Sequence, residues 1–403
     1  MTSQPAPARA TTAELFRSWR GVALLGRGFR PFFLGAGAFA ATAMAIWPAY
    51  FSGLIDVPTA FSPVDWHAHE FVLGYGSAVV AGFLLTAIPN WTGRLPVVGG
   101  RLAALAGLWL AGRVAISASA EIGRAAAGVV DCAFLFALAA VAGREVLAGN
   151  NKRNLKVVGL VVALGLANVA FHGEAWRNGV ALYSARAALA ILVMLILVIG
   201  GRVAPSFTST WLAKSGVKAR PAPFGRFDVA ALAVSAAALV GWVAAPESAV
   251  VGALALVAGG LDIARVARWQ GVRVWRDPLL FVLHVGALFA ALGFVAAGTH
   301  ALAPVAFPYA AAVHVWAIGA VGMMTMAMMT RATLGHSGRP LVASKVTIAA
   351  YCSIVAAVLA RLAMALWPAA AAPAMHVAAC FWVAGFALFL YAYAPLLTRR
   401  ARP

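Results

Sequence analysis

The sequence predicts an all-α polytopic membrane protein, and two observations support this fold class. Hydrophobic residues make up 63% of the 403-residue chain and charged residues only 11%, whereas soluble domains carry roughly 25% charged residues. Apolar runs of about 20 residues, each long enough to cross a hydrocarbon core about 30 Å thick, recur along the whole chain. The alternating pattern of a transmembrane β-barrel is not found in any segment.

We expect twelve membrane-spanning helices, because twelve apolar runs follow one another and most of the loops between them are short. The expected spans are 30–52, 63–90, 99–119, 123–147, 155–173, 183–204, 229–246, 248–266, 277–298, 306–331, 342–367 and 374–396.

The chain divides into one membrane domain and two terminal segments. We expect a cytoplasmic N-terminal segment at 1–29, a membrane domain at 30–396 and a basic tail at 397–403. The hydrophilic loop 207–228, rich in Lys, Arg and Pro, separates two halves of six helices each. These halves are 30–206 and 229–396.

The net charge of +19 reflects membrane topology. If the N-terminus is cytoplasmic, all but five of the 31 basic residues fall in segments on that side. This bias follows the positive-inside rule and predicts that both termini are cytoplasmic. We therefore expect no nucleic-acid partner. The five exceptions are Arg113, Arg124, Arg177, Arg186 and Arg361.

The topology places most of the eight histidines in the outer half of the membrane domain. His284 lies in the inner half near the midplane, and His336 follows the tenth span on the inner side. A lone histidine near a helix end often bonds only a carbonyl or water, which is the alternative for His300, His336 and His376. The outer histidines are His67, His69, His172, His300, His314 and His376.

The stretch "DWHAHEF" at 65–71 opens the second span. Residues two apart on a helix point about 200° apart, so His67 and His69 cannot both bind one metal unless the backbone is broken there. At helical spacing His67 shares a face with Glu70. We expect one histidine to bind a metal and the other to serve a structural or proton-relay role with Glu70.

His284 and His314 sit within apolar runs, where an ionisable side chain is costly and tends to mark a site. Small neighbours, such as Gly286 and Ala311, leave room for a flat macrocycle against these helices. Imidazole is the usual axial ligand of haem iron and also suits copper. The chain has no C-x-x-C-H motif, so a covalently attached c-type haem is excluded. His172, followed by Gly and Glu, adds another imidazole at the outer surface.

Three arginines and one acid remain to be placed in the outer half. Arg113 and Asp131 are expected at one depth on neighbouring helices, and we interpret them as a neutralising structural pair. Arg186 and Arg361 could hold haem propionates as bidentate cations, or they could simply extend to the membrane interface.

Five methionines crowd the tenth span. Methionine thioether is a soft ligand for Cu(I). Five in seven residues cover every face of a helix, however, so we interpret most of them as packing residues. They are Met323, Met324, Met326, Met328 and Met329.

The inner ends of the second, sixth and tenth spans carry related polar sequences. Either these stretches are traces of an internal repeat with a period of four helices, or they are similar only because inner loops share the same polar residues. The stretches are "IPNWTGRLP" at 88–96, "GGRVAPSFTSTW" at 200–211 and "MTRATLGHSGRP" at 329–340.

Several long motifs, in the right order and spread over nearly the whole chain, resemble the NnrS family. They are "GRGFRPFF" (26–33), "WHAHEFVLGYGSAVVAGFLLTAIPNWTGR" (66–94), "GGRVAPSFT" (200–208), "LLFVLHVGALFAALG" (279–293) and "HVWAIGAVGMMTMAMMTRATLGHSGRP" (314–340). The resemblance implies a haem- and copper-containing, twelve-span protein of the bacterial inner membrane that acts in the response to nitric oxide and nitrosative stress. It also implies that six histidines match family positions, without assigning ligands among them: His67, His69, His172, His284, His314 and His336.

Together these arguments predict a non-covalent haem b in the bundle, with copper near His67 and Glu70. Haem iron would bind nitric oxide, in an enzyme that metabolises it or a protein that shields iron from it. Glu70 is the candidate proton carrier, and the electron donor is not identified. The candidate haem-binding residues are His69, His172, His284, His314 and Arg361, and the candidate metal ligands are His67, His69, His172, His284 and His314.

A secondary transporter with a midplane histidine site is the alternative. Its two halves of six helices favour this reading, whereas the lack of clear repeats and of paired broken helices speaks against it.

Overall fold

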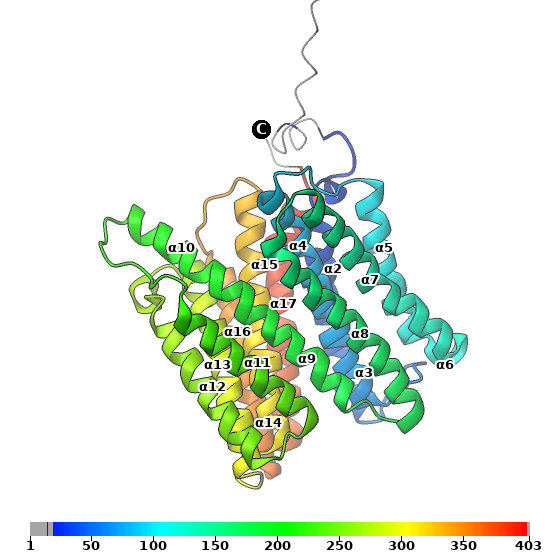
Figure 1. Cartoon of the computed structure of the whole chain (residues 1–403). Helices are drawn as coiled ribbons and strands as arrows, with labels where there is room; N and C mark the ends of the chain where they lie inside the picture. The colour runs from blue at the N-terminus through cyan, green and yellow to red at the C-terminus, as the bar shows by residue number, and fades with distance from the viewer. Residues whose placement is uncertain (1–13, 15–18, 401–403) are drawn as a thin grey trace, which may run out of the picture.

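The computed structural model describes Glu14 and residues 19–400, and every regular element in this part of the chain is a helix. The helices pack into one elongated bundle, and the first and last described segments of the chain meet at the same end of it (Figure 1). Within the described residues, eleven helices are long and apolar enough to cross a membrane. The predicted all-α polytopic fold is thus confirmed, whereas the cytoplasmic location of the termini stays a prediction.

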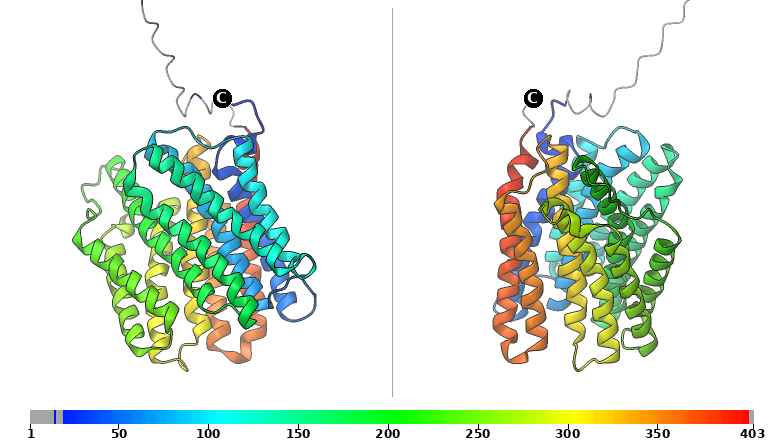
Figure 2. Two further views of the ribbon diagram at one scale, coloured as in Figure 1. Left: turned by 45° about the vertical axis from the view of Figure 1, so that its right-hand side comes forward. Right: turned by 90° about the vertical axis from the view of Figure 1, so that its left-hand side faces the viewer.

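Nine of the predicted spans are single helices in the described chain, and they run roughly parallel through the bundle (Figure 2). They are α2 (Phe29–Phe51), α5 (Gly100–Ser117), α7 (Arg124–Ala148), α8 (Leu155–Asn178), α11 (Arg226–Ala244), α12 (Ala249–Ala267), α13 (Pro278–Leu302), α16 (Lys345–Leu366) and α17 (Ala371–Thr398).

The predicted third span, α5, is the one that falls outside the eleven candidates. It has 18 residues and carries Arg101 and Arg113. A Cβ at Gly112 would lie only 3.2 Å from the Cα of Asp131, so α5 approaches α7 closely at this point. There Arg113 contacts Asp131, as the sequence predicts. A neutralised pair lets a short, charged helix belong to the bundle.

The second, sixth and tenth spans are each interrupted by a π-helical segment, a feature that often marks functional sites. The first consists of α3 (Pro63–His69), η2 (Glu70–Tyr75) and α4 (Gly76–Thr92); the second of α9 (Tyr183–Leu195), η4 (Ile196–Gly200) and α10 (Gly201–Lys214); the third of α14 (Tyr309–His314), η6 (Val315–Gly322) and α15 (Met323–His336).

These three interrupted helices meet in the middle of the bundle. The hydroxyls of Tyr75 and Thr325 lie 2.6 Å apart and join the second span to the tenth. A Cβ at Gly200 would lie 3.2 Å from the terminal methyl of Met324, so the sixth span also packs on the tenth. The related sequences at the C-terminal ends of these spans therefore belong to three helices with the same interruption, spaced four spans apart.

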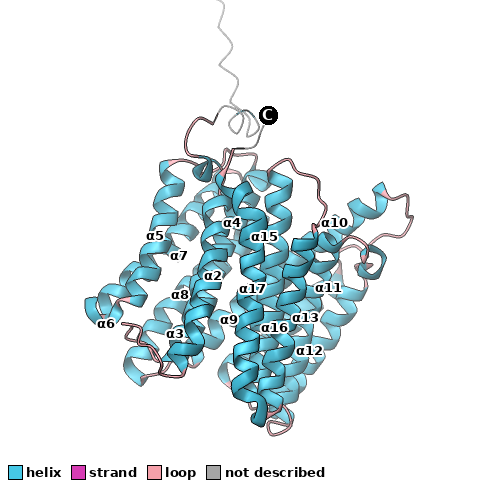
Figure 3. Cartoon of the chain, turned by 180° about the vertical axis from the view of Figure 1, so that it is seen from behind, coloured by secondary structure: helices cyan, strands magenta, loops and turns pink. Residues whose placement is uncertain are grey.

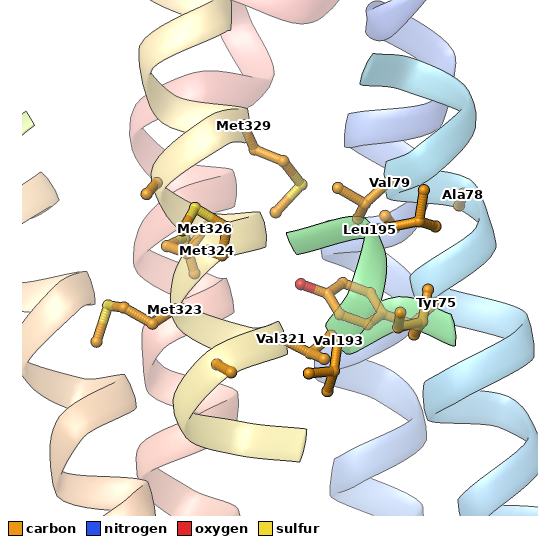
Figure 4. Packing of buried hydrophobic residues seen from close by; sticks show 14 of the residues in the cluster. Tyr75, Ala78, Val79, Val193, Leu195, Val321, Met323, Met324, Met326 and Met329 are labelled. Atoms are coloured by element: carbon orange, nitrogen blue, oxygen red, sulfur yellow. The ribbon is translucent and has the colours of Figure 1, made fainter. Parts of the chain in front are cut away.

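The methionines of α15 fill the core beside this junction (Figure 4). Four of the five are buried and Met328 is partly buried. Their interpretation as packing residues is confirmed. The four buried side chains are Met323, Met324, Met326 and Met329.

The first and last spans close the bundle. Helices α2 and α17 lie side by side although they come from opposite ends of the chain (Figure 3). The indole of Trp382 donates to the carbonyl of Ala40 over 3.0 Å. A Cβ at Gly37 would lie 2.9 Å from the ring of Phe389, so this glycine allows the close approach.

A second buried charge network stabilises the π segment η4. The guanidinium of Arg265 donates to the carbonyl of Leu197 at 3.3 Å and to Asp228 at 3.1 Å. Asp262 lies 3.5 Å from the same guanidinium and accepts from the hydroxyl of Ser235 at 2.7 Å. Arg265 thus satisfies a carbonyl in the widened turn and two buried carboxylates together.

Some boundaries differ from the expected ones. Helix α10 continues to Lys214 and α11 begins at Arg226, so the hydrophilic loop covers 215–225 instead of 207–228. His300, expected in a loop, lies in the last turn of α13. Most of the predicted cytoplasmic segment, including 1–13 and 15–18, and the end of the tail at 401–403 lie outside the described residues.

We predict that both termini face the cytoplasm, because basic residues resist transfer across the membrane. A C-terminal green fluorescent protein fusion should therefore fluoresce. Alkaline phosphatase fused after Val305, which lies in the exposed loop at the opposite end of the bundle, should be active. The reverse pattern of the two reporters would contradict this orientation.

Candidate functional site

Helix α3 positions the site, and its start is locally encoded. The Asp65 amide donates to the Ser62 hydroxyl at 3.2 Å, and Pro63 occupies the first turn. The Asp65 carboxylate also accepts the amide of Ala181 at 3.2 Å, which ties α3 to the segment before α9. This capped helix presents His67 and His69 on opposite sides. It lies at the end of the bundle remote from the termini (Figure 1).

His69 belongs to a buried group of polar residues, here called the His69 cluster. Four helices and the π segment η2 contribute to it, and only the His172 side chain, 14% exposed, reaches the surface. Its members are His69, Glu70, Arg113, Asp131, Asn168 and His172.

One carboxylate oxygen is the centre of the His69 cluster. Asp131 Oδ2 lies 3.1 Å from His69 Nε2 and 3.0 Å from His172 Nε2. The amide of Asn168 donates to the same oxygen at 2.8 Å. Ligand atoms of Asp131 and the two histidines lie within 4.8 Å of one another, close enough to hold a metal ion.

Arg113 joins the two acids of the cluster. Its Nη1 donates to Glu70 Oε1 at 2.5 Å, and its Nη2 contacts Asp131 Oδ1. A Cβ at Gly74 would lie 2.5 Å from the same Nη1, so the glycine in η2 makes room for the guanidinium. The predicted Arg113–Asp131 pair is confirmed, and it extends to a third residue.

Glu70 faces His69, whereas the sequence placed it on the face of His67. His69 Nδ1 lies 2.9 Å from Glu70 Oε1. Regular α-helical spacing was assumed for this prediction, but the π segment begins at Glu70 and changes the direction of the side chains. Glu70 therefore does not lie with His67, and a copper ion near these two residues stays a prediction. The function of Glu70 as a proton carrier stays a prediction.

His67 faces the tenth span and forms a second group, here called the His67 cluster. Its ring and that of His314 are nearly parallel, at an angle of 17°, with centroids 6.3 Å apart. Trp47 stacks on His67 at 4.3 Å and Phe71 contacts it at 4.8 Å. The members are His67, His314, Arg361, Trp47 and Phe71.

Each histidine of this cluster has at least one ring nitrogen that forms no hydrogen bond with another described residue. His314 Nδ1–H donates to the carbonyl of Ala310 at 2.7 Å, which leaves Nε2 with its lone pair. His67 Nδ1 is buried and has no hydrogen-bond partner among the described residues. The charge of Arg361, which is partly buried, acts on both rings.

His284 is in neither cluster. Its Nε2 lies 2.8 Å from the hydroxyl of Thr208, and its ring packs against Trp269. A Cβ at Gly286 would lie 3.1 Å from the backbone of Met324, so this small residue serves helix packing. The expected space for a macrocycle at this glycine is filled.

Three further histidines and Glu174 have local partners. His300 Nδ1 donates to the carbonyl of Phe307 at 3.0 Å, and His376 Nδ1 donates to that of Ala372 at 2.9 Å. The ring of His336 packs against Phe29 with centroids 5.7 Å apart. Glu174, next to the expected imidazole site, accepts three backbone amides from the start of α9. These amides belong to Leu182, Tyr183 and Ser184.

Sequence reasoning missed Asn168. A signal for it exists, since Asn168 lies four residues before His172 in an otherwise apolar span and therefore shares its helix face. An amide in such a span has to find a polar partner, here Asp131.

The fold and these two clusters define a polytopic helical membrane protein with buried, histidine-rich sites at one end of its bundle. Comparison with protein families gives a match to the NnrS protein family over residues 23–400. The chain belongs to the NnrS family, which confirms the resemblance seen in its motifs. A search of curated proteins finds no match.

We predict that Arg113→Met destabilises the protein strongly, because it leaves Glu70 and Asp131 buried without their cation. Loss of one partner from a buried pair costs about 3–5 kcal/mol. Thermal unfolding in detergent should show a clear fall in Tm. Arg124→Met, at an exposed position of α7, is the matched control and should leave Tm almost unchanged. Equal Tm values for the two variants would refute this account of the cluster.

Proposed function

We propose that this protein binds haem b at the His67 cluster and uses it to bind or turn over nitric oxide. Membership of the NnrS family suggests a role in the response to nitric oxide. The proposal adds a cofactor, a position and a chemical step to that role. We also propose that it acts in the bacterial inner membrane.

The observation that carries the proposal is the His67–His314 pair. Two imidazoles from separate spans lie nearly parallel, at an angle of 17° and with their centroids 6.3 Å apart. The two rings are close enough together that both would be able to ligate one haem iron. The unpartnered Nδ1 of His67 is a polar atom whose burial requires compensation, and ligation of a haem iron would provide it.

The surrounding residues fit the same group. Hydrogen bonding to Ala310 fixes the ring of His314, and stacking on Trp47 fixes that of His67. The guanidinium of Arg361 is available for a propionate, which prefers a bidentate cation. When bound, haem would supply an iron atom that changes oxidation state and that takes up nitric oxide in exchange for one of its two imidazole ligands.

The same observations separate the expected haem-binding residues into those at the proposed haem site and those elsewhere. His314 and Arg361 belong to the proposed haem site together with His67, which was expected to hold copper. His69 and His172 lie in the other cluster, and His284 lies with Thr208. We therefore propose His67 and His314 as the haem ligands.

We predict that His314→Ala and His67→Ala each lose most of the haem, because each variant removes one of the two proposed iron ligands. The measurement is the haem content per protein and the Soret absorption of the purified full-length variants, with and without nitric oxide. His376→Ala is the matched control, since its ring bonds only its own helix. We expect wild type, His376→Ala and His284→Ala to retain haem and to show a Soret shift with nitric oxide.

Full haem retention in both His314→Ala and His67→Ala would refute the assignment of ligands. A colourless wild-type protein, purified from cells supplied with haem precursor, would refute haem binding altogether. That result would favour the alternative of a secondary transporter.

A further inference from the structure

We propose that the His69 cluster is a separate binding site for a divalent ion of the first transition series, with His69, His172 and Asp131 as its ligands. This site is additional to the haem proposed at the His67 cluster and does not depend on it. The two sites lie on opposite sides of helix α3, because their histidines are two residues apart.

The donors converge on one point. The Nε2 atoms of His69 and His172 both lie about 3 Å from the same oxygen of Asp131, at 3.1 and 3.0 Å. Without a metal ion, this oxygen would have to accept hydrogen bonds from two imidazoles and from the amide of Asn168. A metal ion between the three ligand atoms would replace the two imidazole protons.

Neighbouring residues orient these ligands in the way that metal sites require. His69 Nδ1–H donates to Glu70 Oε1 at 2.9 Å, which leaves the lone pair of His69 on Nε2. A carboxylate behind a metal-bound histidine commonly fixes its tautomer in this way. Arg113 contacts Asp131 through Oδ1, so Oδ2 is left for the ion.

The donor set identifies the class of ion. Two imidazole nitrogens and one carboxylate oxygen suit divalent iron, zinc or copper better than calcium or magnesium, which prefer oxygen alone. The carbonyl oxygen of Asn168, 3.0 Å from His69 Nε2, is available as a fourth donor. The result is a site with two nitrogen and two oxygen donors.

Charge balance also favours a cation at this position. The carboxylates of Glu70 and Asp131 are buried and contact the single guanidinium of Arg113. One negative charge is thus left over in a region of low dielectric constant, where an uncompensated charge is costly. Compensation requires either a second proton on an imidazole or a metal ion, and the experiment below separates these two cases.

One ligand is close to the surface. A small pocket at the remote end of the bundle is lined in part by His172, the only member of the cluster with an exposed side-chain fraction above 10%. The residues around His172 in this pocket include Phe61, Ser119, Arg124 and Trp176.

The test uses purified full-length protein, first treated with a chelator and then titrated with Co²⁺. Bound Co²⁺ is followed by its visible absorption and by metal analysis after removal of free ion. Wild type should bind about one equivalent, with absorption typical of mixed nitrogen and oxygen ligands. His172→Ala should bind at least 10-fold more weakly, because it removes a ligand.

Two further variants keep the test independent of folding. His172→Gln retains a side chain that can bond Asp131 but is a poor metal ligand, and it should bind Co²⁺ as weakly as His172→Ala. His376→Ala should bind like wild type. Haem content should be unchanged in the His172 variants, whereas His314→Ala should lose haem and still bind Co²⁺.

Wild-type protein that takes up no Co²⁺ would overturn the proposal and leave a protonated imidazole as the compensating charge. Equal Co²⁺ affinity in wild type and both His172 variants would overturn it as well. Failure of the haem assignment would show separately, as haem retained in His314→Ala.

Discussion

The contact of Arg113 with two buried carboxylates is the interaction on which the rest of the site depends. Glu70 and Asp131 come from different helices, and neither can stay ionised in the membrane interior without a cation. Arg113 holds Glu70 Oε1, which also contacts His69, and Asp131 Oδ1, which leaves Asp131 Oδ2 to the two imidazoles. The orientation of His69 and the close packing of α5 on α7 both follow from this arrangement.

Much of this arrangement is encoded in patterns that can be recognised from the sequence. The apolar runs predict the spans. The bias of basic residues predicts their orientation, and together these place Arg113 and Asp131 at the same depth on neighbouring helices. Regular helical periodicity fails at Glu70, because the π segment begins there. Helical periodicity also cannot predict that His284 contacts Thr208, because contacts between distant helices depend on packing angles that a single sequence does not reveal.

The three π segments explain how apolar membrane-spanning helices can place polar groups in the interior of the bundle. A widened turn redirects side chains and releases carbonyls, as at Leu197, where Arg265 is the donor. His69 and His314 each stand immediately before such a segment. Two helices of the central junction therefore place an imidazole at the beginning of their interruption, and these two imidazoles belong to different clusters.

The pairing of α2 with α17 has a consequence for how the molecule is made. Their contact between Trp382 and Ala40 joins residues 342 positions apart. A ribosome delivers the first of these helices to the membrane long before the last, so the wall of the bundle on that side stays open to lipid throughout synthesis. Trp47, whose ring stacks on that of His67, belongs to α2. Phe71, another member of the His67 cluster, packs against Trp382 of α17 with ring centroids 5.7 Å apart, so this cluster is closed only after α17 has joined α2.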